Sequence, residues 1–349
     1  MKNNAEINGM VFLNRFSKYT KSQIIRRWVQ LLFLAVICFI GFMFIRFAGC
    51  LENGILPKVE RPAGVEAFLP ISALVSLKYF VLTGIVNDVH PSALVIFLII
   101  CATTVFVRKG FCAYICPFGL LSEYLYFLHC KIFKNEIRLP ALFDAILRSI
   151  KYGLAGVFIY LIFFRMPVPV IEEFIHSPYH ILADINMYRF FTDISPTALS
   201  VISGIGLMSV LIRNFWCRYL CPYGALLGIL SVISLGRIQL NRSCCKDCGK
   251  CEKVCPGQIH IRQGQAAFSF ECSACLQCVH ACPEKGALKY FFPVKRSSIG
   301  SMGIALIFLA MFTTGITFAK LTDHWKSRIS NEIYFYHMMT EGMLKKTYR

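Results

Sequence analysis

Five apolar stretches divide this 349-residue chain, and each is long enough to cross the hydrocarbon core of a bilayer as a helix. They lie at about 28–48, 91–107, 150–170, 196–212 and 298–319. The composition agrees, because 56% of the residues are hydrophobic and only 16% are charged, whereas soluble domains carry about 25% charged residues. A sixth stretch, 66–86, contains Pro70 and Lys78, so we expect an interfacial or re-entrant segment, or an ordinary packed helix. The chain is therefore predicted to form an all-α membrane bundle of about five transmembrane helices.

Basic residues gather in alternate connections between these stretches. Residues 1–27 hold six basic residues against one acid, segment 108–151 holds seven against three, and segment 213–296 holds twelve against four. Segment 50–90 holds three basic and four acidic residues, and segment 166–195 holds one against four. Because basic connections stay in the cytoplasm, the N-terminus is predicted inside and the C-terminus outside. The net charge of +18 is thus a topology signal and a surface for anionic lipid, and we expect no nucleic-acid partner.

The sequence contains an internal repeat with an offset of 105 residues. "HPSALVIF" from His90 matches "SPTALSVI" from Ser195, and Arg108 aligns with Arg213. Each unit contains an outer loop with an acidic residue, an apolar stretch that starts at a proline, and a Cys-x₃-Cys-Pro motif. Both units run through the membrane in the same direction, so they are parallel repeats. The two units span about 65–128 and 171–233.

The paired cysteines that end each repeat are the first candidate site. Their cysteines are Cys112, Cys116, Cys217 and Cys221. In a helix, two cysteines four residues apart share a face, the proline after each pair suits a helix boundary, and the next glycine allows close backbone approach. A duplicated pair with its proline argues against cysteines that only pack as small hydrophobic residues. We expect four functional thiols that hold a third metal or iron–sulfur centre, or copper, or act as a dithiol/disulfide couple.

Two further cysteine runs carry the strongest signal in the chain. Residues 245–256 read "CKDCGKCEKVCP" and residues 272–283 read "CSACLQCVHACP". Both have the Cys-x₂-Cys-x₂-Cys-x₃-Cys-Pro spacing of bacterial ferredoxins, in which the fourth cysteine of each run crosses to the other [4Fe–4S] cluster. Zinc fits poorly, because structural zinc usually pairs two short knuckles. The spacing predicts cluster 1 on Cys245, Cys248, Cys251 and Cys282, and cluster 2 on Cys272, Cys275, Cys278 and Cys255.

These runs predict a two-cluster, ferredoxin-like α+β domain at 236–293. It follows a transmembrane region at 28–235 and precedes the last transmembrane helix, 298–319, and an extracytoplasmic tail, 320–349. Together with the cytoplasmic segment 1–27, the domain is predicted on the cytoplasmic side, where thiols stay reduced. Nearby basic residues would raise the cluster potentials and help to dock an acidic partner, or they form only a solvated face. These are Lys246, Lys250, Lys253 and Lys285.

Acidic and histidine side chains in the outer loops are candidates for a quinol site. A quinol loses protons with its electrons, so its site needs carboxylates or imidazoles near the membrane surface. On this ground we select Glu66, His90 and Glu172. The sequence contains no Cys-x-x-Cys-His, Gly-x-Gly-x-x-Gly or Walker motif, so covalent haem, a dinucleotide and ATP lack support.

Two Cys-x₃-Cys-Pro motifs at the inner ends of spans, followed by a two-cluster ferredoxin unit, resemble the membrane polyferredoxins of the NapH/NosR type. Those proteins are associated with periplasmic nitrate reductase and nitrous-oxide reductase. The resemblance covers roughly residues 30–320. It implies a protein of the bacterial inner membrane that transfers electrons between the quinol pool, with quinone as a further cofactor, and a partner redox protein. A cytoplasmic donor in place of the quinol pool is the alternative source of the electrons. We expect an electron carrier, or a quinol dehydrogenase subunit, rather than a stand-alone enzyme.

A second hypothesis is an accessory role in the assembly of a metalloenzyme. Similar polyferredoxins act as accessory proteins of cytochrome oxidase and reduce copper for insertion. Four paired membrane thiols suit the soft ion Cu(I).

Overall fold

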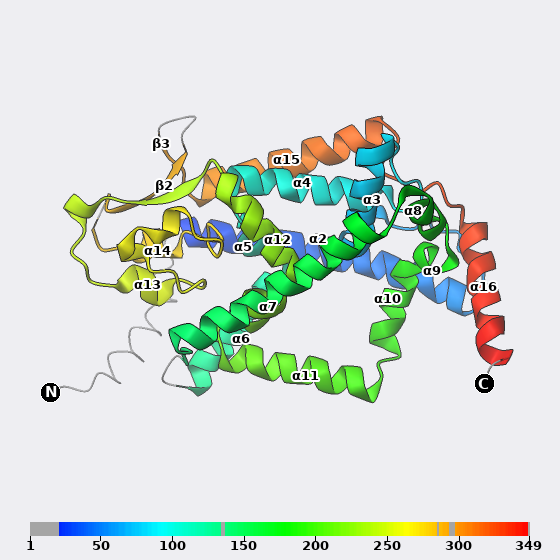
Figure 1. Cartoon of the computed structure of the whole chain (residues 1–349), viewed down its shortest axis with the longest axis horizontal. Helices are drawn as coiled ribbons and strands as arrows, with labels where there is room; N and C mark the ends of the chain where they lie inside the picture. Colours follow the sequence, from blue (N-terminus) through cyan, green and yellow to red (C-terminus); the bar gives the residue numbers. More distant parts are fainter. Residues whose placement is uncertain (1–20, 134–136, 285, 293–296, 348–349) are drawn as a thin grey trace. The chain divides into compact units, whose positions relative to one another are not determined.

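The computed structural model describes residues 21–133, 137–284, 286–292 and 297–347 (Figure 1). The first 20 residues of the predicted segment 1–27, and Lys285, lie outside the described residues. The chain divides into two compact units. Unit 1 consists of Met1–Leu34, Ile100–Ala155 and Ser200–Ala310, and unit 2 consists of Ala35–Ile99, Gly156–Leu199 and Met311–Arg349.

The described chain is mostly helical, and three of its helices are long and apolar enough to cross a membrane. They are α2 (Lys21–Glu52), α7 (Ala141–Tyr160) with its π-helical continuation η2 (Leu161–Arg165), and α15 (Ser301–Leu321). Helices α10 (Ala183–Thr192) and α11 (Pro196–Leu211) meet at an angle of 81° and together would make a fourth span (Figure 1). The predicted span 91–107 is α4 (Pro91–Val107), which has 17 residues and is too short to count with the others. The prediction of five transmembrane helices is therefore neither confirmed nor contradicted.

Prolines set the starts of many helices. A proline ring fixes φ near the helical value and lacks an N–H group that the first turn could not use, so proline suits the first helical position. Six of the described helices begin at Pro70, Pro91, Pro117, Pro178, Pro196 and Pro222. The proline-started stretches of the sequence repeat, at Pro91 and Pro196, thus become helices with matching starts.

Unit 1 contains the cysteine motifs. The first pair lies around α5 (Gly110–Tyr114) and α6 (Pro117–Ile132), and the second around the π-helix η3 (Trp216–Leu220) and α12 (Pro222–Leu230). The chain then enters a three-stranded antiparallel sheet of order β1-β2-β3. Its strands are β1 (Arg237–Leu240), β2 (Leu288–Phe292) and β3 (Ser297–Ser298).

The sheet closes a small α+β unit around the two longer cysteine runs. In the register of β1 and β2, Ile238 lies opposite Tyr290, and both side chains are buried. Between the strands lie two one-turn helices, α13 (Lys250–Val254) and α14 (Gln277–Ala281), which Figure 1 shows side by side. Short 3₁₀ helices complete the segment: η5 (Arg242–Cys244), η6 (Ile261–Gln263) and η7 (Gln265–Ala267).

Unit 2 is built around a buried cluster of aliphatic and aromatic side chains that includes Phe47, Leu51, Ile171 and Tyr334. Its elements besides the long helices are η1 (Ala63–Phe68), α3 (Pro70–Thr83), α8 (Val168–Ile175), α9 (Pro178–Ile181) and α16 (Asn331–Thr347).

The stretch 66–86 becomes the short helix α3, which packs against α8 and η2. Its buried Lys78 donates hydrogen bonds to the carbonyl oxygens of Ile162, Phe163 and Met166. These carbonyls end the α7–η2 helix and lack partners within it, so an ammonium group satisfies them and complements the negative helix end. A lysine in this apolar stretch therefore has a structural partner.

Candidate iron–sulfur and thiol sites

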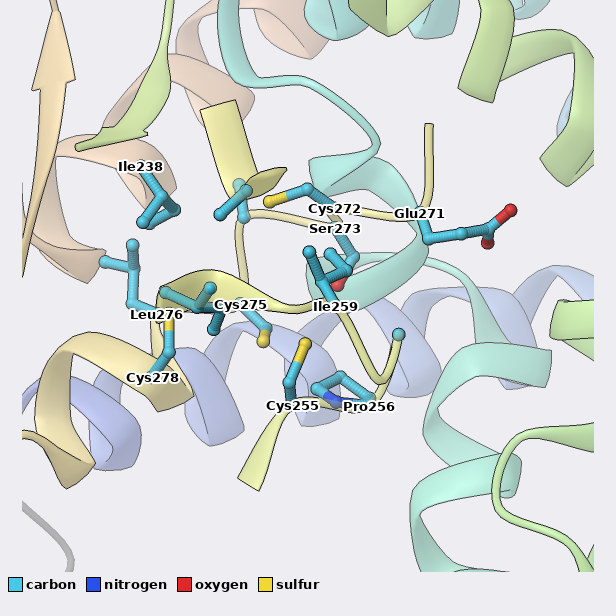
Figure 2. Close-up of a pocket in the computed structure, with 14 residues that line it drawn as sticks. Ile238, Cys255, Pro256, Ile259, Glu271, Cys272, Ser273, Cys275, Leu276 and Cys278 are labelled. Atoms are coloured by element: carbon cyan, nitrogen blue, oxygen red, sulfur yellow. The ribbon is translucent and has the colours of Figure 1, made fainter. Parts of the chain in front are cut away.

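Four cysteines from two separate segments line one cavity of the α+β unit. They are Cys255, Cys272, Cys275 and Cys278, and the cavity has an empty volume of about 360 Å³. Figure 2 shows the sulfur atoms of Cys255 and Cys275 pointing toward each other. All four side chains are buried, with at most 8% of their surface exposed. This is the set predicted for cluster 2, including the cysteine that crosses from the first run.

A second cavity, with an empty volume of about 330 Å³, contains the other four cysteines. Cys245, Cys248, Cys251 and Cys282 line it. Cys251 is buried, Cys248 is exposed, and the other two are half-buried. This is the set predicted for cluster 1, again with the crossing cysteine, so the structure brings together both predicted groups.

The crossing follows from the two one-turn helices. Cys251 lies in α13, and Cys255 follows the end of that helix in an extended conformation. Cys278 and Cys282 have the same relation to α14. A turn of helix thus separates the third and fourth cysteine of each run, and each helix delivers its two sulfurs to different cavities.

The loops between the first three cysteines share an unusual backbone. Asp247 and Gly249 flank Cys248 with φ of 50° and 67°, and Ala274 and Leu276 flank Cys275 with φ of 49° and 58°. Residues other than glycine are uncommon in this left-handed region and persist there only when the surroundings impose it. In the first loop the amide of Asp247 donates to the sulfur of Cys245 over 3.4 Å. Both runs therefore wrap their cavities with the same backbone shape.

The donor set fits a [4Fe–4S] cluster, which is held by four thiolates. Each cavity offers four cysteines. The first is otherwise lined mostly by apolar residues such as Leu276 and Ile259, whereas the second is lined by Leu240 and Leu288 together with the charged residues Lys246, Arg262 and Glu284. Among the residues that the structure describes, no three His, Cys, Asp or Glu side chains converge on a single-ion position.

The Cys-x₃-Cys-Pro pairs do not lie on continuous helices, contrary to the simplest geometry for their spacing. Helix α5 ends at Tyr114 and η3 ends at Leu220, so Cys116 and Cys221 lie between helices. Each adopts an extended conformation and caps the helix that starts at the following proline. In the second pair the amide of Gly224 donates to the sulfur of Cys221 over 3.3 Å. The proline was correctly predicted at a helix boundary.

The glycine after each pair allows a close backbone approach, as expected. A Cβ atom on Gly119 would overlap the carbonyl oxygen of Cys112, whereas one on Gly224 would lie 3.6 Å from the carbonyl oxygen of Cys217. The first repeat is therefore the more tightly packed.

The four paired thiols form one half-buried group in unit 1. Burial raises the pKa of Cys112 well above its ordinary value, and the nearby thiols of Cys116, Cys221 and Cys217 raise it further. Burial likewise raises the pKa of Cys116 to about 11 and that of Cys217 to about 12. The hydroxyl oxygen of Ser122 lies 3.6 Å from the sulfur of Cys217. A thiol has to lose its proton to bind a metal, so the raised pKa values oppose metal binding by this group unless the metal displaces the protons.

Side chains at the inner ends of the repeats hold the loops of cluster 2. The guanidinium of Arg108 donates to the carbonyl oxygens of Ala267 and Ser269 at 2.5 and 2.6 Å. Arg213, its counterpart in the repeat, donates to the carbonyl oxygen of Val254 and the side chain of Gln277 at 3.0 and 3.3 Å.

A buried ion-pair network also links the paired thiols to Cys272, and the sequence reasoning missed it. Lys109 lies three residues before Cys112, and its ammonium is 3.4 Å from the carboxylate of Glu271. Lys151 approaches the same carboxylate at 2.5 Å. Burial alone would raise the pKa of Glu271, but the two ammonium groups lower it to about 2. The sequence feature that could have indicated this network is the acidic residue Glu271 directly before Cys272.

The structure brings together two of the three quinol-site candidates. Glu66 and His90 are fully buried in unit 2, with the His90 Nδ1 atom 3.3 Å from the Glu66 carboxylate. Arg61, which the sequence did not single out, lies 2.7 Å from Glu66, 3.0 Å from His90 and 2.5 Å from Asp184. The third candidate, Glu172, is apart and accepts a 2.9 Å hydrogen bond from the hydroxyl of Tyr79.

Glu66 has a full set of hydrogen-bond donors. Besides Arg61, the hydroxyl of Ser92 and the backbone amide of Ala93 donate to it at the start of α4. Burial alone would raise the pKa of Glu66, but the charge of Arg61 and the hydrogen bond from Ser92 help to lower it to about 2. The carboxylate therefore stays charged at neutral pH.

Comparisons with known proteins point the same way. A family described as a 4Fe-4S binding domain matches twice, at residues 89–136 and 194–241, with the offset of the predicted repeat and with one Cys-x₃-Cys-Pro motif in each match. The chain is 34% identical over 315 residues to YccM of Escherichia coli (strain K12), which is named for electron transport, and the match covers 88% of each chain.

Weaker similarity extends to two further relatives. The chain is 27% identical over 186 residues to the ferredoxin-type protein NapH of Haemophilus influenzae, covering 51% of this chain and 60% of NapH. It is 27% identical over 220 residues to the protein NirI of Paracoccus denitrificans, covering 62% of this chain and 31% of NirI. No solved structure matches.

Proposed function

This chain belongs to the ferredoxin-type membrane proteins of the NapH/NosR type, which carry out iron–sulfur electron transfer, and on that premise we propose that it relays electrons between the membrane quinol pool and a partner redox protein. The observation that carries the proposal is the sorting of eight cysteines into two four-cysteine cavities, each lined by residues of both runs. Each bound [4Fe–4S] cluster would take up and release one electron at a time.

The residues of this chain hold and position the clusters. The eight thiols supply the ligands, and the left-handed residues around Cys248 and Cys275 shape the two loops. Arg108 and Arg213 fix the loops of cluster 2 to the ends of the repeats. We assign the protein to the bacterial inner membrane with the ferredoxin unit in the cytoplasm, because segments 108–151 and 213–296 carry the excess of basic residues.

Glu66 and His90 stay our candidates for the quinol site, with Glu172 as a separate one, and of the first two only His90 would accept a proton, because the Glu66 carboxylate stays charged. The Nδ1 atom of His90 accepts from Arg61, which can only donate, and its Nε2 atom lies 2.8 Å from the carbonyl oxygen of His180. A proton reaching Nδ1 would have to displace Arg61. If the site lies here, His90→Gln should slow the reduction of the clusters by a quinol, while dithionite still reduces them fully.

Iron analysis tests the proposal. The protein is purified without oxygen, iron and acid-labile sulfide are counted per chain, and EPR spectra are recorded after reduction with dithionite. About eight irons would match the two cavities, and about twelve would place a third cluster on the paired thiols. A protein without iron or without an EPR signal after reduction would reject the relay.

The group of four paired thiols favours a second candidate, an accessory factor that reduces or delivers copper. Thiolates select Cu(I) over harder ions, and these four lie outside both ferredoxin cavities. The test replaces Cys112, Cys116, Cys217 and Cys221 by serine in cells that make a copper enzyme. Unchanged assembly of that enzyme would reject this role, and the eight ferredoxin cysteines should still hold their iron.

A further inference from the structure

The surroundings of the two cavities differ, although their cysteine runs are alike. All four cysteines of the cluster 2 cavity are buried, with 7–8% of their surface exposed. In the cluster 1 cavity only Cys251 is buried, and Cys248 is exposed. Electron transfer weakens steeply with distance, so a soluble redox protein would reach cluster 1 more readily than cluster 2.

The contacts from the membrane repeats go to the cluster 2 side. Arg213 binds the carbonyl oxygen of the residue before Cys255, and Gln23 of α2 donates to the carbonyl oxygen of Cys275 over 3.2 Å. Arg108 binds the segment that leads into Cys272. The polar contacts described around the cluster 1 loop, in contrast, come from within the α+β unit, such as Arg262 with Asp247 and Glu252.

The paired thiols are also tied to cluster 2. Lys109 precedes Cys112 by three residues, and its side chain is buried. The same ammonium pairs with Glu271, the residue before Cys272. One buried cation therefore connects the thiol group at the repeat ends with a ligand loop of cluster 2.

From these three observations we propose that cluster 2 exchanges electrons with the membrane repeats, and that cluster 1 exchanges them with an acidic, soluble one-electron carrier. The carrier docks on a basic rim formed by Arg242, Lys246, Lys250 and Lys253. This order rests on the proposed relay and deepens it. In each transfer to the carrier, cluster 1 loses one electron and the oxidised carrier gains it, and no bond or proton moves.

The charge of the rim supports an acidic partner. All four rim side chains belong to exposed residues. Of the acids beside them, Asp247 and Glu252 pair with Arg262, outside the rim, whereas Glu284 pairs with Lys246 at 2.7 Å and offsets its charge, so Arg242, Lys250 and Lys253 carry most of the positive charge of the rim. Lys250 and Lys253 lie on α13, directly beside the cluster 1 ligand Cys251. Such a patch raises the association rate with an oppositely charged protein and loses that effect in salt.

Stopped-flow kinetics test the rim. The full-length protein in lipid nanodiscs is reduced with dithionite, freed of excess reductant and mixed with oxidised rubredoxin, an acidic one-electron acceptor. In the double variant Lys250→Glu with Lys253→Glu, the rate constant should fall about tenfold at low ionic strength, and the difference should shrink in salt. The control Lys131→Glu with Arg138→Glu, which makes the same charge change at exposed residues of unit 1, should stay within about twofold of the unmodified protein.

Loss of single clusters tests the order. Cys251→Ser should remove cluster 1 and slow rubredoxin reduction at least about tenfold, while Cys278→Ser should remove cluster 2 and leave the rate from pre-reduced cluster 1 nearly unchanged. Equal rates of rubredoxin reduction in the two cysteine variants would overturn the proposed order of the clusters. Equal slowing in the two charge variants would overturn the proposed docking rim. Iron counts and EPR spectra of each variant show separately whether the clusters exist, so a failure of the relay itself is recognised first.

Discussion

The guanidinium of Arg213 donates a 3.0 Å hydrogen bond to the carbonyl oxygen of Val254, the residue that precedes Cys255. Its partner in the repeat, Arg108, holds the carbonyl oxygens of Ala267 and Ser269 ahead of Cys272. Two aligned arginines of the membrane repeats thus hold the two chain segments that supply one cavity.

Replacing Arg213 should loosen cluster 2 and spare cluster 1. Arg213→Gln removes a hydrogen bond from a charged group, which is worth about 1.5–3 kcal/mol. In purified protein exposed to air, we expect the iron of cluster 2 to be lost faster than in the unmodified protein. The control is Arg242→Gln, on the exposed side of cluster 1. If both variants lose iron at the same rate, the hydrogen bond from Arg213 to the carbonyl oxygen of Val254 does not protect cluster 2.

Double variants can establish which cysteines share a cluster. Cys255→Ala and Cys275→Ala fall in one cavity, so either variant alone and the two together should each retain about four of eight irons. Cys255→Ala combined with Cys248→Ala should retain none, because the two residues line different cavities. If Cys255 instead bound the cluster of its own run, the double variant with Cys275→Ala would retain no iron, and the double variant with Cys248→Ala would retain about four irons.

The glycines after the cysteine pairs should differ in their tolerance of a methyl group. Gly119→Ala forces α6 away from the carbonyl oxygen of Cys112 and should cost about 1–3 kcal/mol, as overpacking usually does. Gly224→Ala meets only ordinary van der Waals distances and should be nearly neutral. Thermal unfolding of both variants in the same detergent measures the difference. Equal melting temperatures would contradict the close approach in the first repeat.

Unit 2 should lose stability in mild acid because of His180. Burial and the neighbouring His90 lower the pKa of His180 to about 3, whereas an unfolded histidine has a pKa near 6.5. Between these values the unfolded chain binds a proton that the folded protein excludes, so the free energy of unfolding falls as the pH drops below 6.5. At pH 5 the loss should be about 2 kcal/mol. Glu66 does not contribute at that pH, because its carboxylate is charged in both states.

Thermal unfolding at pH 7 and pH 5 checks this expectation. The neutral variant His180→Gln should remove most of the pH dependence, although it also alters the contact with Ser72. A protein equally stable at both pH values would show that His180 is not held neutral.

Local signals in the sequence predicted the contents of the two ferredoxin cavities. The spacing of two, two and three residues before a final Cys-Pro is a local code, and the structure groups the eight cysteines in the predicted way. The close approach at Gly119 and the helix starts at Pro117 and Pro222 were local as well.

The break within each Cys-x₃-Cys pair was also readable but was missed. A residue before proline is driven out of the helical region, and Cys116 and Cys221 indeed have ψ of 123° and 106°. The helical spacing of the cysteines was the weaker signal, and the steric effect of the proline ring outweighed it.

No local pattern indicated which residues form the long-range ion pairs. Arg61 and Asp184 are 123 residues apart, and Lys109 and Glu271 are 162 residues apart. Pairs of this kind depend on how distant segments fold against each other, which no local pattern in one sequence records. The three quinol-site candidates were chosen by loop and charge alone, and so Glu172 was grouped with two residues whose contacts it does not share.

The residues that flank Cys248 and Cys275 have matching left-handed conformations, so each of the two cysteine loops can adopt the backbone of the other. The segments between the outer cysteines, 246–250 and 273–277, have equal length and the same backbone shape but opposite character, since one carries two lysines and the other serine, alanine and leucine. An exchange of these segments would place the lysines of the first loop beside cluster 2 and the uncharged residues of the second loop beside cluster 1, while every cysteine keeps its position in the sequence. The reduction potentials of this protein could therefore be reprogrammed by grafting five residues, without redesign of the fold.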